Sequence, residues 1–148
     1  MSISICPVDS RNREEAEKLH TAPEQINFVE PVAECMAEAD ELSDWEPVCI
    51  MDGSTPVGFS MYGLMRREPN HRLWFDRLLI DEKFQHRGYG RKAVELVLAQ
   101  MKKEYPGRDI FLSVYEDNPT AIELYRSFGF SFNGELDTKG EKIMVLKA

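Results

Sequence analysis

Apolar and polar positions alternate along several short stretches of the chain, which is the pattern of β-strands with one buried face. Strands are expected at about residues 3–8, 48–51, 56–65, 72–80, 110–114, 130–132 and 143–146. The dipeptide Asp52-Gly53 predicts a tight hairpin between the second and third of these, and Lys139-Gly140 predicts a turn between the last two. The strands therefore belong to a sheet with antiparallel hairpins.

Apolar residues at helical spacing predict helices between the strands. One is expected to be capped by Asp9 or Ser10 and to run to about Leu19, and others begin near Pro23 and Pro31. A long helix is expected over residues 89–104, and a last one starts at Asn118-Pro119 and ends by Gly129. Without a repeat or a linker, residues 1–148 are interpreted as one mixed α+β domain.

The net charge of −8 is concentrated at one end of the chain. Residues 1–46 hold 12 acidic and three basic residues, which is −9, so residues 47–148 carry −8 + 9 = +1. An acidic surface repels nucleic acid and attracts cationic ligands, so no nucleic-acid partner is expected. Solvated faces of two amphipathic helices explain the same acids without any ligand.

Cysteine, histidine and hydropathy patterns limit the protein class further. Three widely spaced cysteines indicate reduced thiols in a cytoplasmic protein, and three histidines without metal-ligand spacing predict no metal site. No apolar run is long enough for a membrane span, and the polar N-terminus lacks a signal-peptide core. We therefore expect no membrane partner.

The stretch Gln85–Arg91 carries the strongest chemical signal, because it joins an apolar strand to a helix through closely spaced glycines. Such a turn points several backbone N–H groups in one direction at the positive end of the helix dipole, which suits a phosphate. Gly88 and Gly90 allow the backbone to approach the anion closely. The loop lacks the P-loop and dinucleotide-binding patterns. A turn that merely starts a helix remains the alternative.

A second group of residues lies on the predicted helix after residue 118. Tyr125 follows Asn118 by seven residues, about two helical turns, so both project to nearly the same side. This helix follows the strand that ends at Val114 and would lie beside the glycine loop if the two strands are neighbours. A phenol there can protonate a leaving thiolate, although Tyr125 and Phe128 also suit an apolar core.

Together, Gln-x-x-Gly-x-Gly after a strand and the later Asn…Leu-Tyr-x-x-x-Gly-Phe resemble the Gcn5-related N-acetyltransferase (GNAT) superfamily. The resemblance implies an α+β fold with a mostly antiparallel, twisted sheet of six to seven strands, about four helices, and strands splayed at an acetyl-CoA site. It implies acetyl-CoA as co-substrate and Tyr125 as general acid for the CoA thiolate. The cofactor-binding residues it implies are Leu78, Leu79, Ile80, Gln85, His86, Arg87, Gly88, Tyr89, Gly90, Arg91, Asn118 and Tyr125.

Residues 74–82 and 130–137 are also similar to the bacterial polyamine N-acetyltransferases of this superfamily. That similarity places a catalytic carboxylate at Asp76, where apolar surroundings could raise its pKa, or where a water could relay the proton. The alternative is that Asp76 only pairs with Arg77 or Arg72. Strand alternation predicts Asp76 on one face of the sheet, with Phe75 and Arg77 on the other.

A cationic acceptor would need carboxylates beside the reacting nitrogen. An acidic stripe is predicted on one helix face, because four glutamates recur at helical spacing: Glu30, Glu34, Glu38 and Glu41. Their like charges repel one another, and a bound polycation would reduce this repulsion. Trp45, beside two acids, could add a cation–π contact to an ammonium. For each residue alone, a solvated acidic face explains the pattern as well.

The leading functional prediction is acetyl-CoA-dependent N-acetylation of spermidine or spermine, which are small cationic amines. The alternatives are another cationic acceptor, such as an aminoglycoside, a diamine or a protein lysine, and a non-catalytic acyl-CoA-binding sensor. The C-terminal strands, residues 130–146, offer an edge through which a homodimer could form.

Overall fold

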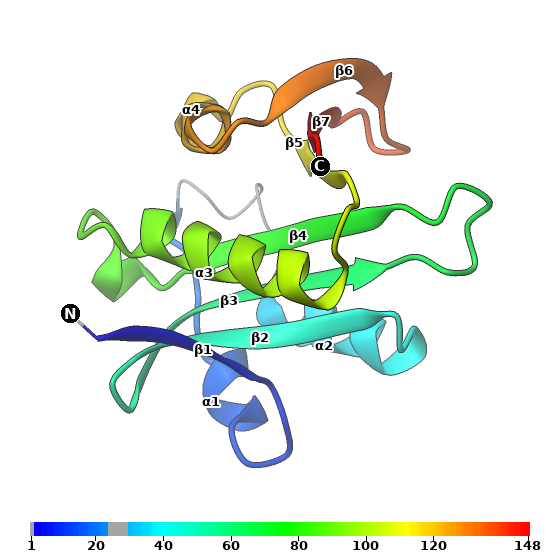
Figure 1. The fold of residues 1–148 in the computed structure, drawn as a ribbon. Coiled ribbons are helices and arrows are strands. Elements are labelled where there is room, and N and C mark those ends of the chain that lie inside the picture. Colours follow the sequence, from blue (N-terminus) through cyan, green and yellow to red (C-terminus); the bar gives the residue numbers. More distant parts are fainter. Residues whose placement is uncertain (1, 24–29) are drawn as a thin grey trace.

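The computed structural model describes residues 2–23 and 30–148, and these form one seven-stranded mixed sheet (Figure 1). The strand order is β1-β2-β3-β4-β5-β7-β6, and every neighbouring pair is antiparallel except the parallel pair β4 and β5. The strands are β1 (Ile3–Pro7), β2 (Trp45–Asp52), β3 (Thr55–Leu64), β4 (Leu73–Ile80), β5 (Ile110–Val114), β6 (Ser131–Leu136) and β7 (Lys142–Leu146). The predicted α+β fold is confirmed.

Four α-helices and the short 3₁₀ helix η2 (Glu82–Phe84) accompany the sheet in the described part of the chain. The α-helices are α1 (Arg13–Glu17), α2 (Val32–Glu41), α3 (Tyr89–Glu104) and α4 (Pro119–Ser127). Figure 1 shows α3 across one face of the sheet, with α1 and α2 on the opposite face. Apolar residues of α3 recur every three or four positions, so one stripe of the helix is buried on the strands.

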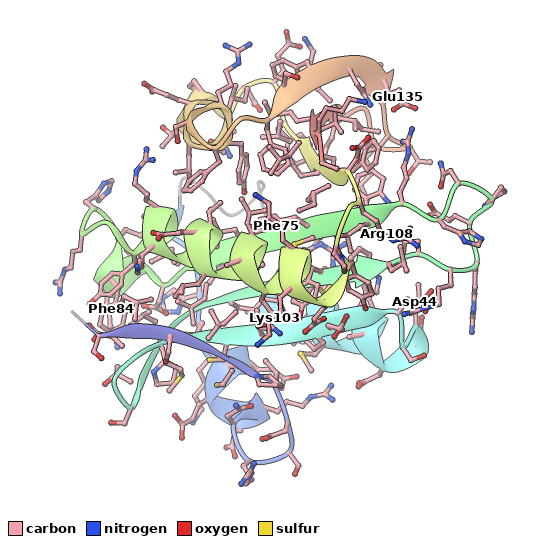
Figure 2. The ribbon with its side chains drawn as sticks, viewed as in Figure 1. Asp44, Phe75, Phe84, Lys103, Arg108 and Glu135 are labelled. Carbon is pink, nitrogen blue, oxygen red and sulfur yellow. The ribbon has the colours of Figure 1, made fainter. Side chains whose placement is uncertain are left out.

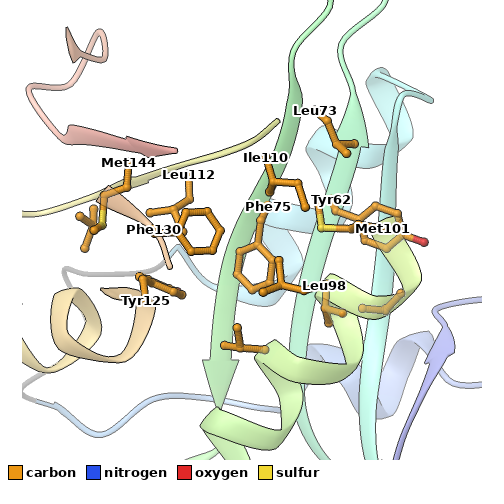
Figure 3. Packing of buried hydrophobic residues seen from close by; sticks show 14 of the residues in the cluster. Tyr62, Leu73, Phe75, Leu98, Met101, Ile110, Leu112, Tyr125, Phe130 and Met144 are labelled. Carbon is orange, nitrogen blue, oxygen red and sulfur yellow. The ribbon is translucent and has the colours of Figure 1, made fainter. Parts of the chain in front are cut away.

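Each face of the sheet has its own apolar core. On the α3 side, Phe75 packs between Leu98 of α3 and the aromatic side chains of Tyr125 and Phe130 (Figure 3). The ring centroids of Phe75 and Tyr125 are 5.9 Å apart in an edge-on arrangement. On the other side, Cys35 of α2 belongs to the buried cluster over β2 and β3. Both cores therefore fix β4 in position.

The sheet opens between β4 and β5, where the predicted splay is found. The two strands pair only at Leu73 with Ile110 and at Trp74 with Phe111. Beyond Trp74 they diverge, so the edge of β4 from Asp76 to Ile80 is not paired with β5. A strand edge without a partner presents free backbone donors and acceptors. This opening positions the candidate site.

The predicted elements are found with few changes. The N-cap of the first helix is Asn12 instead of Asp9 or Ser10, because the side chains of Asp9 and Asn12 bond the intervening turn. The strand predicted from residue 48 starts earlier, at Trp45. The helix start predicted near Pro23 runs into residues 24–29, outside the described residues.

Candidate active site

A groove runs between the exposed part of β4, the glycine loop and the start of α4. It is lined by Thr21, Leu78, Leu79, Ile80, Phe84, Gln85, His86, Gly88, Tyr89, Gly90, Asp117, Asn118, Pro119, Thr120, Ala121, Leu124 and Tyr125. Figure 2 shows Phe84 at the end of the molecule where α3 begins. The groove thus joins the two motifs that the sequence singled out.

The glycine loop ends in a left-handed cap on α3. Gly88 is the N-cap residue, with φ +84°, and His86 also has a positive φ of +63°. A glycine adopts this conformation without a steric penalty, whereas a histidine adopts it at a cost of order 1 kcal/mol. The N–H groups of the first turn of α3, from Tyr89 onward, have no acceptor within an α-helix, which makes this helix end suitable for an anion.

Side chains of the glycine loop and the start of α3 form hydrogen bonds with neighbouring elements. The Gln85 amide donates to the Ile80 carbonyl at 2.9 Å, and the Tyr89 hydroxyl donates to Asp52 at 2.6 Å. Arg91 donates to the Ser127 hydroxyl at 3.0 Å, which links α3 to α4. These contacts hold the loop in one conformation, so its backbone N–H groups are preorganised.

The absence of a side chain at Gly90 leaves space in the groove for a ligand. A Cβ added at Gly90 would lie 4.0 Å from both Ile80 and Leu124, two residues that line the groove. A side chain there would therefore project into the groove, which the glycine leaves open. Together with the splayed β4 edge and the α3 N-terminus, this space suits an extended chain that ends in a phosphate.

A second pocket continues from the groove and is much more polar. It is lined by Glu30, Asp76, Arg77, Leu78, Ser113, Val114, Tyr115, Asn118, Ala121, Tyr125, Asp137, Thr138, Lys139 and Glu141. Leu78, Asn118, Ala121 and Tyr125 line both the groove and this pocket. The two spaces meet beside Tyr125, so a donor in one can reach an acceptor in the other.

Asn118 and Tyr125 stand at this junction for different structural reasons. Asn118 is the N-cap of α4, and its side-chain oxygen accepts a hydrogen bond from the Ala121 N–H at 3.3 Å. Tyr125 is only 9% exposed and packs edge-on against Phe75 and Phe130. Burial, followed by the nearby Asp76 carboxylate, raises the pKa of Tyr125 well above its usual range. The phenol therefore keeps its proton at neutral pH.

Asp76 lies in the polar pocket, with 26% of its side chain exposed. Burial raises the pKa of Asp76 to about 6. The Arg77 guanidinium opposes this rise, and the Glu30 and Glu141 carboxylates add to it. A carboxyl with this pKa is largely ionised at neutral pH and is a competent proton acceptor.

The prediction that Asp76 and Arg77 lie on opposite faces of the sheet is wrong. A bulge interrupts the pairing of β3 and β4, where Met61 pairs with Asp76 but Phe59 pairs with Leu79. Arg77 sits in this bulge with φ +60°. Its Nε lies 3.6 Å from the Asp76 carboxylate, so the sequence alternative of an Asp76–Arg77 ion pair is also present.

Of the four predicted acids, Glu30 and Glu38 converge on Arg77, at 3.0 and 2.5 Å. Glu30 lies just before α2 and also lines the polar pocket. Glu34 and Glu41 are exposed and do not line it. Trp45 packs against the core on the α2 side, in a separate depression with Met36 and Pro47. The structure thus brings together only part of the predicted acidic stripe.

Sequence reasoning missed Asp137 and Glu141, which bring two further carboxylates to the pocket from the turn between β6 and β7. Burial, and then the Asp137 carboxylate, raises the pKa of Glu141. The sequence did contain a signal for them, because the two acids lie on either side of the predicted Lys139-Gly140 turn. The strand that follows this turn, β7, pairs with β5 beside the pocket. The pocket lining holds four acidic residues and two basic residues, Arg77 and Lys139.

Comparison with known proteins defines the class. Residues 13–130 match the acetyltransferase (GNAT) family. A Bacillus subtilis (strain 168) protein named spermine/spermidine N(1)-acetyltransferase is 40% identical over 149 residues, which cover 98% of this chain and 98% of that protein. The chain belongs to the GNAT family, and the predicted enzyme class, an N-acetyltransferase, is confirmed.

Solved structures share the fold. An acetyltransferase from Thermus thermophilus has a TM-score of 0.77 at 22% identity, with 100% of this chain and 98% of that chain covered. Spermidine N-acetyltransferase from Vibrio cholerae, in complex with CoA and spermine, has a TM-score of 0.75 at 15% identity, with 97% of this chain and 93% of that chain covered. At these identities the likeness concerns the fold.

Two further properties concern the described residues alone. None of their helices combines the length and the apolar character needed to cross a lipid bilayer. Within residues 2–23 and 30–148, no three His, Cys, Asp or Glu side chains are grouped so as to hold a metal ion.

Proposed function

We propose that this enzyme transfers the acetyl group of acetyl-CoA directly to a primary amine of spermidine or spermine. The observation that carries the proposal is the junction at Tyr125, where a groove suited to CoA meets a pocket lined by four acids. The 40% identity to a protein named spermine/spermidine N(1)-acetyltransferase, over nearly the whole of both chains, supports the choice of acceptor.

The donor would bind in the groove, which supplies groups for each part of the molecule. The pyrophosphate would lie against the N–H groups of residues 86–91 at the start of α3. The pantetheine arm would bond the backbone edge of Leu78–Ile80 that β5 does not pair, between the splayed strands. Asn118 would contact its end from the first turn of α4. The thioester supplies the activated acetyl group.

Asp76 would act on the acceptor. An ammonium is not a nucleophile, so the amine has to lose a proton before it attacks. The pKa of Asp76, raised to about 6 chiefly by burial, leaves the carboxylate ionised at neutral pH and able to accept that proton directly or through a water. Arg77 at 3.6 Å holds the carboxylate in the pocket and balances its charge.

Tyr125 would act on the leaving group. Its phenol lines both spaces and keeps its proton at neutral pH, because burial raises its pKa. It can therefore donate a proton to the departing thiolate. Asp76 and Tyr125 thus have complementary protonation states, with a base on the acceptor side and an acid on the donor side.

The acceptor's other amines would be held by carboxylates of the same pocket. Glu30 and Asp76 both contact the Arg77 Nε, at 3.0 and 3.6 Å, so the two carboxylates are close neighbours. Asp137 and Glu141 provide further negative charge at the pocket. We further propose that the enzyme works in the cytoplasm as a homodimer.

Thiol release from acetyl-CoA, measured against several acceptors, tests the proposal. Spermidine and spermine should give the highest kcat/KM, above putrescine, an aminoglycoside and a lysine-containing peptide. A higher kcat/KM for the peptide or the aminoglycoside would show that the acceptor is not a polyamine, although acetyl transfer from acetyl-CoA to an amine would still hold. If acetyl-CoA binds and none of these amines is acetylated, the proposed acceptor is wrong.

A further inference from the structure

Lys139 places a cation of the protein's own in the polar pocket. It lies in the turn between β6 and β7, and its Nζ is 2.9 Å from the Glu30 Oε1, although the two residues are 109 positions apart in the sequence. Both residues line the pocket that contains Asp76 and Tyr125. The ion pair therefore forms part of the lining of the proposed acceptor pocket.

The backbone of this turn is held firmly, whereas the Lys139 side chain reaches outward from it. The Asp137 carboxylate accepts hydrogen bonds from the N–H groups of Lys139 and Glu141, at 2.9 and 2.8 Å. The side chain of Lys139 is 55% exposed, so it meets Glu30 at the solvent side of the pocket. Its ammonium can leave Glu30 without any change in the turn.

Electrostatics show that the position beside Glu30 suits a primary ammonium. Burial works against ionisation of Glu30, but the Lys139 ammonium and the Arg77 guanidinium outweigh it and hold the pKa of Glu30 below its ordinary value. The same contact raises the pKa of Lys139. Arg77 also bonds Glu38 and Asp76, so its charge is already shared among several carboxylates.

The chemical match with the proposed acceptor is close. A lysine side chain is a four-carbon chain that ends in a primary ammonium, which is the same group as the aminobutyl arm of spermidine. We infer that Lys139 occupies the position of a remote ammonium of the acceptor and is displaced from Glu30 when a polyamine binds. This inference rests on the proposed function and makes Lys139 a specificity-determining residue for the acceptor.

Displacement has a kinetic signature. A polyamine has to compete with Lys139 for Glu30, so the wild-type enzyme binds the acceptor more weakly than the pocket allows. Loss of the lysine charge should lower the KM for the polyamine and leave the chemical step and the donor site unchanged. A purely structural role for the ion pair predicts the opposite, namely a higher KM or a lower kcat.

The test compares Lys139→Gln with the wild type, using initial rates of thiol release at fixed ionic strength. We expect the KM for spermidine to fall about threefold to tenfold, with kcat within about twofold and an unchanged KM for acetyl-CoA. Lys139→Arg keeps the charge and should stay near the wild-type KM. Lys147→Gln is the matched control, because Lys147 pairs with Asp109 at 3.4 Å outside the pocket.

The outcomes separate this inference from the proposed function. Wild-type turnover of spermidine together with an unchanged or raised KM in Lys139→Gln overturns the role of Lys139 alone. A wild-type enzyme that acetylates no polyamine removes the proposed acceptor, and the role of Lys139 falls with it. Thermal unfolding of both Lys139 variants should show the wild-type midpoint within a few degrees, since the Lys139 side chain is 55% exposed and Glu30 keeps its contact with Arg77.

Discussion

Asp76 and Arg77 are consecutive residues of β4 whose charged groups meet, with the Arg77 Nε 3.6 Å from the Asp76 Oδ2. An ordinary strand would separate their side chains onto opposite faces. The bulge at Arg77 brings them together and gives the half-buried Asp76 an adjacent cation. The protonation behaviour of the proposed base therefore follows from an irregularity in the strand.

The pH dependence of catalysis should report the ionisation of Asp76. Since burial raises its pKa to about 6, the carboxylate form gains population as the pH rises through that value. We expect kcat/KM for spermidine to rise with pH through about 6. Asp76→Asn should lower kcat/KM by about a hundredfold or more and remove its rise with pH near 6. A wild-type profile without a step near that pH would exclude Asp76 as the base.

Asp76→Asn should also stabilise the folded protein at neutral pH. A carboxyl whose folded pKa lies above its unfolded value destabilises the folded state progressively as the pH rises from about 4 to about 6, and the full loss is present above about 6. We expect a gain of on the order of 1–3 kcal/mol in the free energy of unfolding near pH 7.5, measured by urea denaturation. The gain should shrink as the pH falls from about 6 to about 4, where both states hold the proton. A less stable variant at neutral pH would contradict this account.

Tyr125→Phe isolates the phenolic proton. The ring contacts with Phe75 and Phe130 are retained, so the fold should be little affected. We expect kcat to fall about a hundredfold or more while acetyl-CoA affinity, measured by calorimetry, stays nearly constant. Tyr105→Phe is a suitable control, because it removes a hydroxyl that bonds Glu46 away from the groove and the pocket. Equal turnover of both variants would show that the Tyr125 proton is not used.

Gly90→Ala separates helix stability from donor binding. Alanine favours a helix by up to about 1 kcal/mol over glycine, so the melting temperature should stay the same or rise. The added Cβ would lie in the groove beside Ile80 and Leu124, so the Kd for acetyl-CoA should rise about tenfold or more. Glu95→Ala, on the exposed side of α3, is the control and should leave this Kd unchanged. A Gly90→Ala enzyme with wild-type affinity would place the donor elsewhere.

Local signals predicted much of this fold. The bounds of α3 follow from its apolar stripe, from Gly88 before it and from Pro106-Gly107 after it, so residues 89–104 were predicted as found. The first helix was predicted too long, because the side chains of Asp9 and Asn12 hold their own turn. Periodicity carries no information about such side-chain bonds.

The composition of the pocket was harder to predict, since it depends on contacts between distant segments. The bulge at Arg77 reverses the alternation on which the face of each side chain was predicted. Asp137 and Glu141 reach the pocket only because β7 pairs with β5 and carries the turn with it. The glycine loop and Tyr125 were found more easily, because each lies within one short motif.

The most direct test of the account is the mass spectrum of spermidine after incubation with the wild-type enzyme and acetyl-CoA. We predict a product heavier by one acetyl group, with fragment ions that place the acetyl on a primary amine, and almost none of it from Tyr125→Phe at equal enzyme concentration. Unmodified spermidine in the wild-type reaction, under conditions in which another amine is acetylated, would contradict the proposal that the acidic pocket beside Tyr125 receives a polyamine.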